Sequence, residues 1–261
     1  RIQTIDSANF LAYTRQSQLQ KMFDNYIDAV YDTSTKRVKD NLHLSSARDG
    51  VIRRSSFYDN IILYETAQLA RQLGLQDKYN IANSENKQML KNFYWNESAG
   101  FYNDDIKTKS FSSDFLIGYV NNFFDLNDLT DLSRTKTTID YLNDSELVRP
   151  FPIKYQIDGN PNVPKFVDYF VANYGRNVIW SYWGSQYITL LSDMHKKTGD
   201  SKYKNEALKY LGIYEQNLIR DQGLAETYSP DGRFLRTGIY KSIRSTGWVV
   251  QLEHAKYSLE H

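Results

Sequence analysis

Two loops of the sequence carry carboxylates in settings where acid–base chemistry is possible. One of them reads Gly-Leu-Ala-Glu226-Thr-Tyr228 and continues into a Pro-Asp-Gly segment. Because Pro-Asp-Gly is a turn signal, Glu226 is expected just before a chain reversal, near Tyr228 and Trp248. This setting suits a general base in an aromatic-walled cleft. An exposed glutamate next to a turn would have the same local pattern.

The second loop, 33–55, combines acidic and basic residues ahead of a predicted helix. It contains Arg48-Asp49-Gly and, four positions after Asp49, the pair Arg53-Arg54, and Asp59 then opens the helix. Asp49 could act as a catalytic acid or could pair with a neighbouring arginine in a turn. Asp59 could bind substrate or could interact with the helix dipole. The residues alone leave both alternatives open.

A third stretch places aromatic and amide side chains together. Trp180, Trp183 and Tyr187 are spaced i, i+3 and i+7, which puts them on one face of one helix, and Asn177 and Gln186 lie close by. Such a stripe is usually core packing. Flat aromatic faces beside amide donors are also what a sugar-binding site needs.

Composition excludes several other functions. The net charge is +1 without a basic stripe, so nucleic acid is not an expected partner. There is no cysteine, no apolar run approaches the roughly 20 residues of a membrane span, and His43, His195 and His254 lack metal-ligand spacing. Phosphate-binding glycine motifs are missing as well, so we expect neither a metal nor a cofactor.

Helical periodicity dominates the chain and indicates an all-α fold. We expect about eight helices, at 6–30, 56–73, 77–93, 112–125, 128–143, 178–197, 201–219 and 245–258, with hardly any strand. Short turns alternate with long loops at 33–55, 94–111, 144–176 and 220–244, and long loops are uncommon unless they carry function. This pattern predicts helical hairpins whose long loops build one site, in a single domain over 1–261. We expect residues 259–261 to be an expression-tag remnant, and the sequence leaves the cellular location open.

Five segments, in order, resemble the loop motifs of the six-hairpin glycosidases, the (α/α)6-barrel group of trehalases, processing α-glucosidase I relatives and amylo-α-1,6-glucosidases. They are Asp49 with Arg53, the Asp59-Asn60 dyad, Trp95-Asn96 with Gly100-Phe101-Tyr102, Asn177-Val-Ile-Trp180, and Glu226-Thr-Tyr228-Ser-Pro230-Asp-Gly232 with Gly247-Trp248. None is specific alone, but their order and loop context match the group. The resemblance implies an (α/α)6 toroid of helical hairpins.

The resemblance further implies an inverting exo-glycoside hydrolase that acts on α-glucosidic linkages. Asp49 would be the general acid and Glu226 the general base, with roughly 6.5–9.5 Å between them. Because three arginines near Asp49 would favour its ionised form, Asp40 is the alternative acid. The implied sugar-binding residues are Arg53, Asp59, Asn177, Trp180, Trp183, Gln186, Tyr228 and Trp248.

A full toroid has twelve helices, and about eight are expected here. The resemblance therefore covers the C-terminal two-thirds of a barrel, and we expect a missing N-terminal segment or a second chain to complete it. A non-catalytic carbohydrate-binding or scaffold protein on the same fold is the alternative function. A sugar epimerase or polysaccharide lyase ranks behind both, because the chain has so few histidines.

Overall fold

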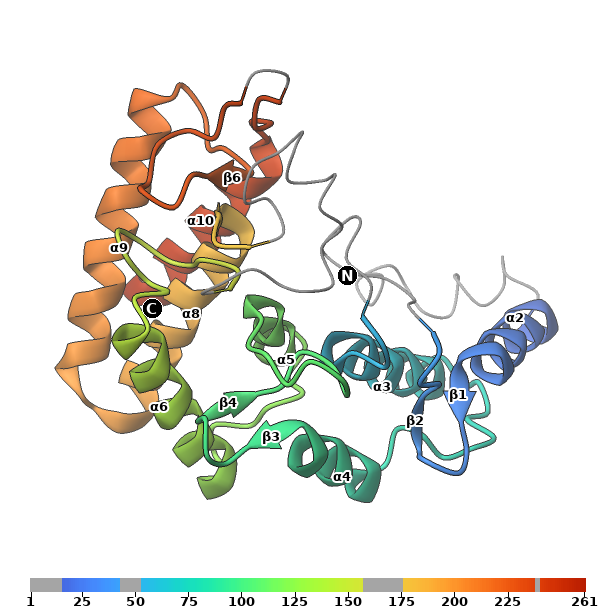
Figure 1. Cartoon of the computed structure of the whole chain (residues 1–261). Helices are drawn as coiled ribbons and strands as arrows, with labels where there is room; N and C mark the ends of the chain where they lie inside the picture. Colours follow the sequence, from blue (N-terminus) through green and yellow to red (C-terminus); the bar gives the residue numbers. More distant parts are fainter. Residues whose placement is uncertain (1–15, 43–52, 157–175, 238–239) are drawn as a thin grey trace.

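The structure, a computed structural model, describes residues 16–42, 53–156, 176–237 and 240–261, and within these ranges helices are the main secondary structure, joined by long loops. Its eight α-helices are α2 (Gln16–Val30), α3 (Phe57–Gln72), α4 (Ser84–Tyr94), α5 (Ile117–Val120), α6 (Leu129–Asp144), α8 (Ser181–Thr198), α9 (Ser201–Arg220) and α10 (Thr246–Glu260), with one 3-10 turn, η2 (Ser113–Leu116). Figure 1 shows α8, α9 and α10 on one side of the molecule and α2, α3 and α4 on the other, with α5 between them.

Three antiparallel pairs of two-residue strands hold segments of the loops together. They are β1 (Tyr31–Asp32) with β2 (Arg37–Val38), β3 (Trp95–Asn96) with β4 (Phe101–Tyr102), and β5 (Ile179–Trp180) with β6 (Thr227–Tyr228). The first two pairs are local hairpins. The third joins the segment before α8 to the loop after α9, and it therefore brings two distant loops to one place.

The hairpin α8–α9 turns as the sequence predicts. Gly199 ends α8 in the left-handed conformation with φ 72°, and Asp200 caps α9 by accepting a hydrogen bond from the Lys202 amide at 2.9 Å. Helix α10 packs against both α8 and α9. This three-helix group carries the loop that contains Glu226.

Two predicted helices differ from the observed ones. The segment 112–125 is not one helix, because Asn122 turns the chain with φ 58° and the Phe124 amide bonds back to the Gly118 carbonyl at 3.0 Å, which ends α5 after one turn. The helix expected from Asp77 begins at Ser84. The Asp77 carboxylate instead accepts from the Ala82 amide and holds a turn before the helix.

Long loops are joined to one another by backbone hydrogen bonds near the starts of α3 and α8. The Phe57 amide donates to the Asp104 carbonyl at 2.8 Å, and the Ser113 amide to that of Tyr155 at 3.2 Å. Further along, the Ser181 amide donates to the Glu226 carbonyl at 3.0 Å. Segments far apart in the sequence thus form one connected surface at these helix starts.

Gly184 sets how closely α8 approaches its neighbours. A Cβ there would clash with the Tyr214 hydroxyl and lie 2.5 Å from the Pro152 carbonyl oxygen. By contrast, Gly212 in α9 has nothing within 4 Å of its added Cβ. We therefore expect Gly184→Ala to lower the free energy of unfolding by about 1–3 kcal/mol through overpacking.

Gly212→Ala is the matched control. It should raise the free energy of unfolding by up to about 1 kcal/mol, because alanine is the better helix former and no contact opposes it. Urea denaturation of both variants measures the difference. Equal effects of the two substitutions would contradict the packing argument.

Candidate active site

Glu226 lies at the start of β6 and is held there by its backbone. Its amide donates to the Ile243 carbonyl at 2.7 Å and its carbonyl accepts from the Ser181 amide. The next residue, Thr227, pairs with Trp180 in the β5–β6 ladder. The side chain is half-buried. The backbone of Glu226 is therefore fixed beside the first turn of α8.

The phenol of Tyr240 lies close to the Glu226 carboxylate. The pKa of Tyr240 is raised, mainly because the ring is partly buried and further because of the negative charge of Glu226. Tyr240 thus stays protonated at neutral pH.

A buried arginine forms the second polar group of this region. Arg53 has no exposed surface, and its Nη1 contacts Asp104 Oδ1 at 2.5 Å and Asp114 Oδ2 at 2.7 Å. Both aspartates are buried too, and Asp114 also accepts hydrogen bonds from the Ser112 and Tyr155 hydroxyls, each at 2.5 Å. Burial is the largest single effect on the pKa of Arg53, and it lowers that pKa. The charges of the two carboxylates together outweigh burial, so the pKa of Arg53 lies well above its ordinary value. The guanidinium therefore remains charged.

Aromatic side chains connect this cluster to Glu226. The Tyr155 ring, whose hydroxyl binds Asp114, lies 6.0 Å from the Trp180 ring in an edge-on arrangement. Trp180 in turn pairs with Thr227, the neighbour of Glu226. A continuous series of contacts through Tyr155 and Trp180 thus links Asp114 to the loop that contains Glu226.

Three half-buried aromatic residues add exposed ring surface nearby. The Tyr58 ring lies 5.9 Å from the Arg53 guanidinium, and the Tyr182 ring lies 6.0 Å from that of Trp248. Burial, and after it the charge of Asp114 and the phenol of Tyr182, raises the pKa of Tyr58 to about 12. These neutral rings suit contact with an uncharged ligand.

Of the two candidates for the general acid, Asp40 lies within the residues that the structure describes. Asp49 lies outside the described residues. Asp40 is exposed and its nearest cation is Arg37, at 3.6 Å. A catalytic acid must hold its proton near neutral pH, which needs burial or a nearby negative charge. The described surroundings of Asp40 show neither, and its role as the alternative acid stays a prediction.

Three further residues were predicted to bind sugar, and their surroundings differ. Asp59 is buried in the first turn of α3, where its amide donates to the Ser56 hydroxyl at 3.0 Å. Asn177 is half-buried just before β5. Gln186 donates to Gln251 at 2.8 Å and thereby links α8 to α10.

Three predicted sugar-stacking residues are instead part of the core. Trp180 is 5% exposed, and Trp183 is 2% exposed and packs edge-on against Tyr182. Tyr228 has no exposed surface, packs against Phe151, and accepts a hydrogen bond from the Ala225 amide. The prediction that they stack on sugar is wrong, because neighbouring side chains cover all three rings.

The sequence prediction missed Asp104, Asp114, Tyr155 and Tyr182. Asp104 directly follows the Gly-Phe-Tyr-Asn segment, and Asp114 follows a Ser-Ser pair. An acidic residue at the end of a recognised loop motif was the available signal. Only the folded chain brings Asp104 and Asp114 next to Arg53.

Within the described ranges, no three His, Asp or Glu side chains gather where they could hold a metal ion. None of the helices in the same parts of the chain is both long and apolar enough to cross a bilayer.

Replacing Arg53 with methionine tests the buried cluster. Two carboxylates would remain buried without their cation, so we expect Arg53→Met to lower the free energy of unfolding by about 3–5 kcal/mol. The adjacent Arg54 is exposed, and Arg54→Met should stay within about 0.5 kcal/mol of the wild type. Denaturant unfolding measures both free energies. A small effect of Arg53→Met would contradict the conclusion that Arg53 compensates the charges of the two buried aspartates.

A comparison with models of protein families and a search of curated protein sequences find no match to this chain. Among solved structures, the chain is similar to the Glycoside Hydrolase Family 15 Glucoamylase from Hypocrea jecorina, with a TM-score of 0.54 and 15% sequence identity. The match covers 87% of this chain and 45% of that one, so the chain spans less than half of its structural relative. At this identity the similarity concerns the fold. It confirms the predicted all-α fold of helical hairpins, which forms part of an (α/α)6 toroid.

Proposed function

We propose that the chain is a glycoside hydrolase that cleaves α-glucosidic linkages from a chain end with inversion, and that Glu226 is its general base. The observation that carries the proposal is the position of Glu226. Glu226 is half-buried, its backbone is fixed beside the β5–β6 pair, and a series of contacts through Trp180 and Tyr155 connects its loop to the buried arginine–aspartate cluster. The similarity of the fold to that of a glucoamylase supports the same reaction class.

In this reaction Glu226 accepts a proton from the water that attacks the anomeric carbon. An inverting enzyme needs a carboxylate that is ionised and reachable by water, which suits a half-buried side chain. Fixing its backbone at both the amide and the carbonyl restricts where the carboxylate can lie. A base held in this way contributes through orientation as well as through basicity.

The Arg53 cluster is proposed to hold the loops that form the sugar-binding surface. Arg53, Asp104 and Asp114 are all buried, so we assign their ion pairs a positioning role rather than contact with the sugar. Tyr182 and Trp248, which are half-buried, supply the aromatic surface on which a sugar ring can rest.

The general acid is proposed to be Asp49, on the sequence resemblance alone. Asp104 and Asp114 are poor candidates, because a carboxylate in an ion pair with Arg53 favours its deprotonated form. That same observation favours the second candidate function, a non-catalytic carbohydrate-binding protein. If the wild type binds maltooligosaccharides but releases no glucose from them, the second function holds.

Replacing Glu226 with glutamine tests the base. Glu226→Gln keeps the shape of the side chain but cannot accept the proton, so kcat/KM for maltooligosaccharides should fall by about 10²–10⁴-fold. Asp231→Asn is the matched control, since this exposed carboxylate of the same loop contacts its near neighbours Arg233 and Ser229. Glucose release measures activity, and NMR of the first product should show the β-anomer. Full activity in Glu226→Gln would exclude the assignment.

The acid can be separated from the base by the choice of leaving group. Fluoride departs without protonation, so Asp49→Asn should lose maltose hydrolysis yet retain hydrolysis of α-glucosyl fluoride. Glu226→Gln should lose both, because each substrate needs an activated water. Asp40→Asn serves as the control and should behave as the wild type. If Asp40→Asn instead shows the leaving-group dependence, Asp49 is not the acid.

A further inference from the structure

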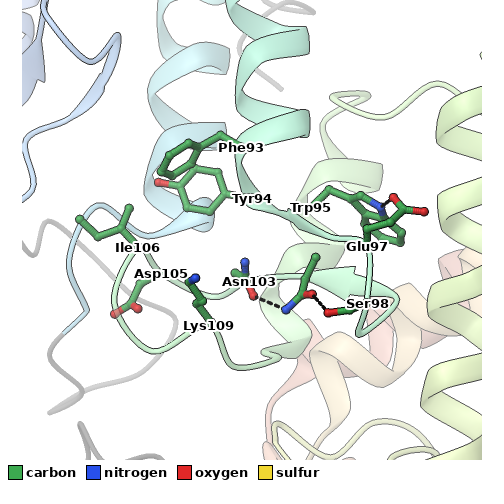
Figure 2. Close-up of a pocket in the computed structure, with 10 residues that line it drawn as sticks. Phe93, Tyr94, Trp95, Glu97, Ser98, Asn103, Asp105, Ile106 and Lys109 are labelled. Atoms are coloured by element: carbon green, nitrogen blue, oxygen red, sulfur yellow. Dashed lines mark hydrogen bonds between the residues drawn. The ribbon is translucent and has the colours of Figure 1, made fainter.

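A groove of about 470 Å³ lies beside the β3–β4 hairpin at the end of α4. Its ten lining residues are Phe93, Tyr94, Trp95, Asn96, Glu97, Ser98, Asn103, Asp105, Ile106 and Lys109, and Figure 2 shows them surrounding it from the helix end, the hairpin and the following loop. A second groove of about 370 Å³ is also lined by Trp95 and Glu97. The two grooves therefore share Trp95 as a lining residue.

Trp95 is held in a fixed orientation. Its ring lies 5.0 Å from that of Tyr102 in an edge-on arrangement, and the Arg134 guanidinium lies 5.1 Å from its centroid. The indole N–H donates to Glu97 at 2.5 Å. The ring is still half-buried rather than covered. A ring that is already fixed loses little conformational freedom when a ligand packs on it.

The polar lining is rich in neutral amide and hydroxyl groups. The Asn96 amide donates to Asn103 at 3.2 Å and its oxygen accepts from the Ser98 hydroxyl at 2.9 Å. Asp105 is buried, and its carboxylate already accepts from the Arg54 amide and from the turn that follows it. The groove thus combines aromatic surface with oriented neutral donors and acceptors, with Glu97 and Lys109 at the exposed margin.

This groove lies on the opposite side of the loop that contributes to the candidate active site. Successive residues of an extended segment point to opposite faces. In the bend that follows β4, Asp104 likewise binds Arg53, whereas its neighbours Asn103 and Asp105 line the groove. The Arg54 amide bonds to Asp105 at 3.3 Å. The two sites therefore share one stretch of backbone but present different side chains.

We propose that this groove is an accessory carbohydrate-binding site, separate from the site of Glu226, that holds a segment of a glucan chain. Pyranose rings have an apolar C–H face and a rim of hydroxyls, which matches a fixed indole beside oriented amides. A nucleotide or a phosphate would need clustered cations, and the groove offers only Lys109 at its margin. The choice of an α-glucan as the probe rests on the proposed function, whereas the location of the groove does not.

Affinity electrophoresis of the full chain in gels that contain soluble starch tests the proposal. Every protein carries Glu226→Gln, so that hydrolysis does not change the ligand. Adding Trp95→Ala, or adding Ser98→Trp to fill the groove from an exposed position, should weaken retention roughly tenfold, the loss expected when a central aromatic contact is removed. Tyr257→Ala removes a 61% exposed ring on α10 and should leave retention unchanged.

Ser98→Trp decides the outcome, because Trp95→Ala also removes a packing contact with Tyr102 and could unfold the hairpin. Unchanged starch retention in Ser98→Trp, with a wild-type melting temperature, would overturn the accessory site. The result is independent of the proposed hydrolase. A wild type that cleaves no α-glucoside but shows Ser98-sensitive retention would refute the enzyme and support the groove.

Discussion

The ion pairs of Arg53 with Asp104 and Asp114 are the interaction on which the candidate site depends. A guanidinium without any exposed surface is costly to bury unless carboxylates compensate its charge. Here both partners come from loops distant in sequence, one after β4 and one in η2. The cluster therefore fixes the start of α3 against those two loops. Tyr155 extends the constraint to Trp180, and through β5–β6 to Glu226.

The helices could be predicted from the sequence because their signals are local. Apolar periodicity, the Gly199-Asp200 turn and capping residues specify most of the observed segments. The short α5 could not be recognised from periodicity, because its end depends on Asn122 adopting a positive φ. The pairing of Arg53 could not be predicted either, since its partners lie 51 and 61 residues away. The position of Asp49 remains a prediction.

The tryptophan stripe of α8 shows why residue type alone does not identify a sugar-binding surface. The spacing of Trp180, Trp183 and Tyr187 is usual for core packing and is also compatible with sugar contact. Because α9 and α10 pack on α8, the face that carries these residues is buried, and Trp183 lies within the core. Exposed aromatic surface instead comes from Tyr182, which lies off the stripe, and from Trp248 at the start of α10.

The loop after β4 determines how the two proposed binding surfaces are related. Its backbone directs Asp104 inward to Arg53 and Asn103 outward to the groove. A change of backbone position there would move both surfaces, whereas a side-chain change at the hairpin tip alters only the groove. Binding of a glucan chain beside Trp95 would therefore stabilise a loop that also carries a carboxylate of the Arg53 cluster. The hydrogen bonds from the Arg54 amide to Asp105 and from the Ile106 amide to the Arg54 carbonyl also link the start of α3 to the groove, so they offer a second route by which the two sites can be coupled.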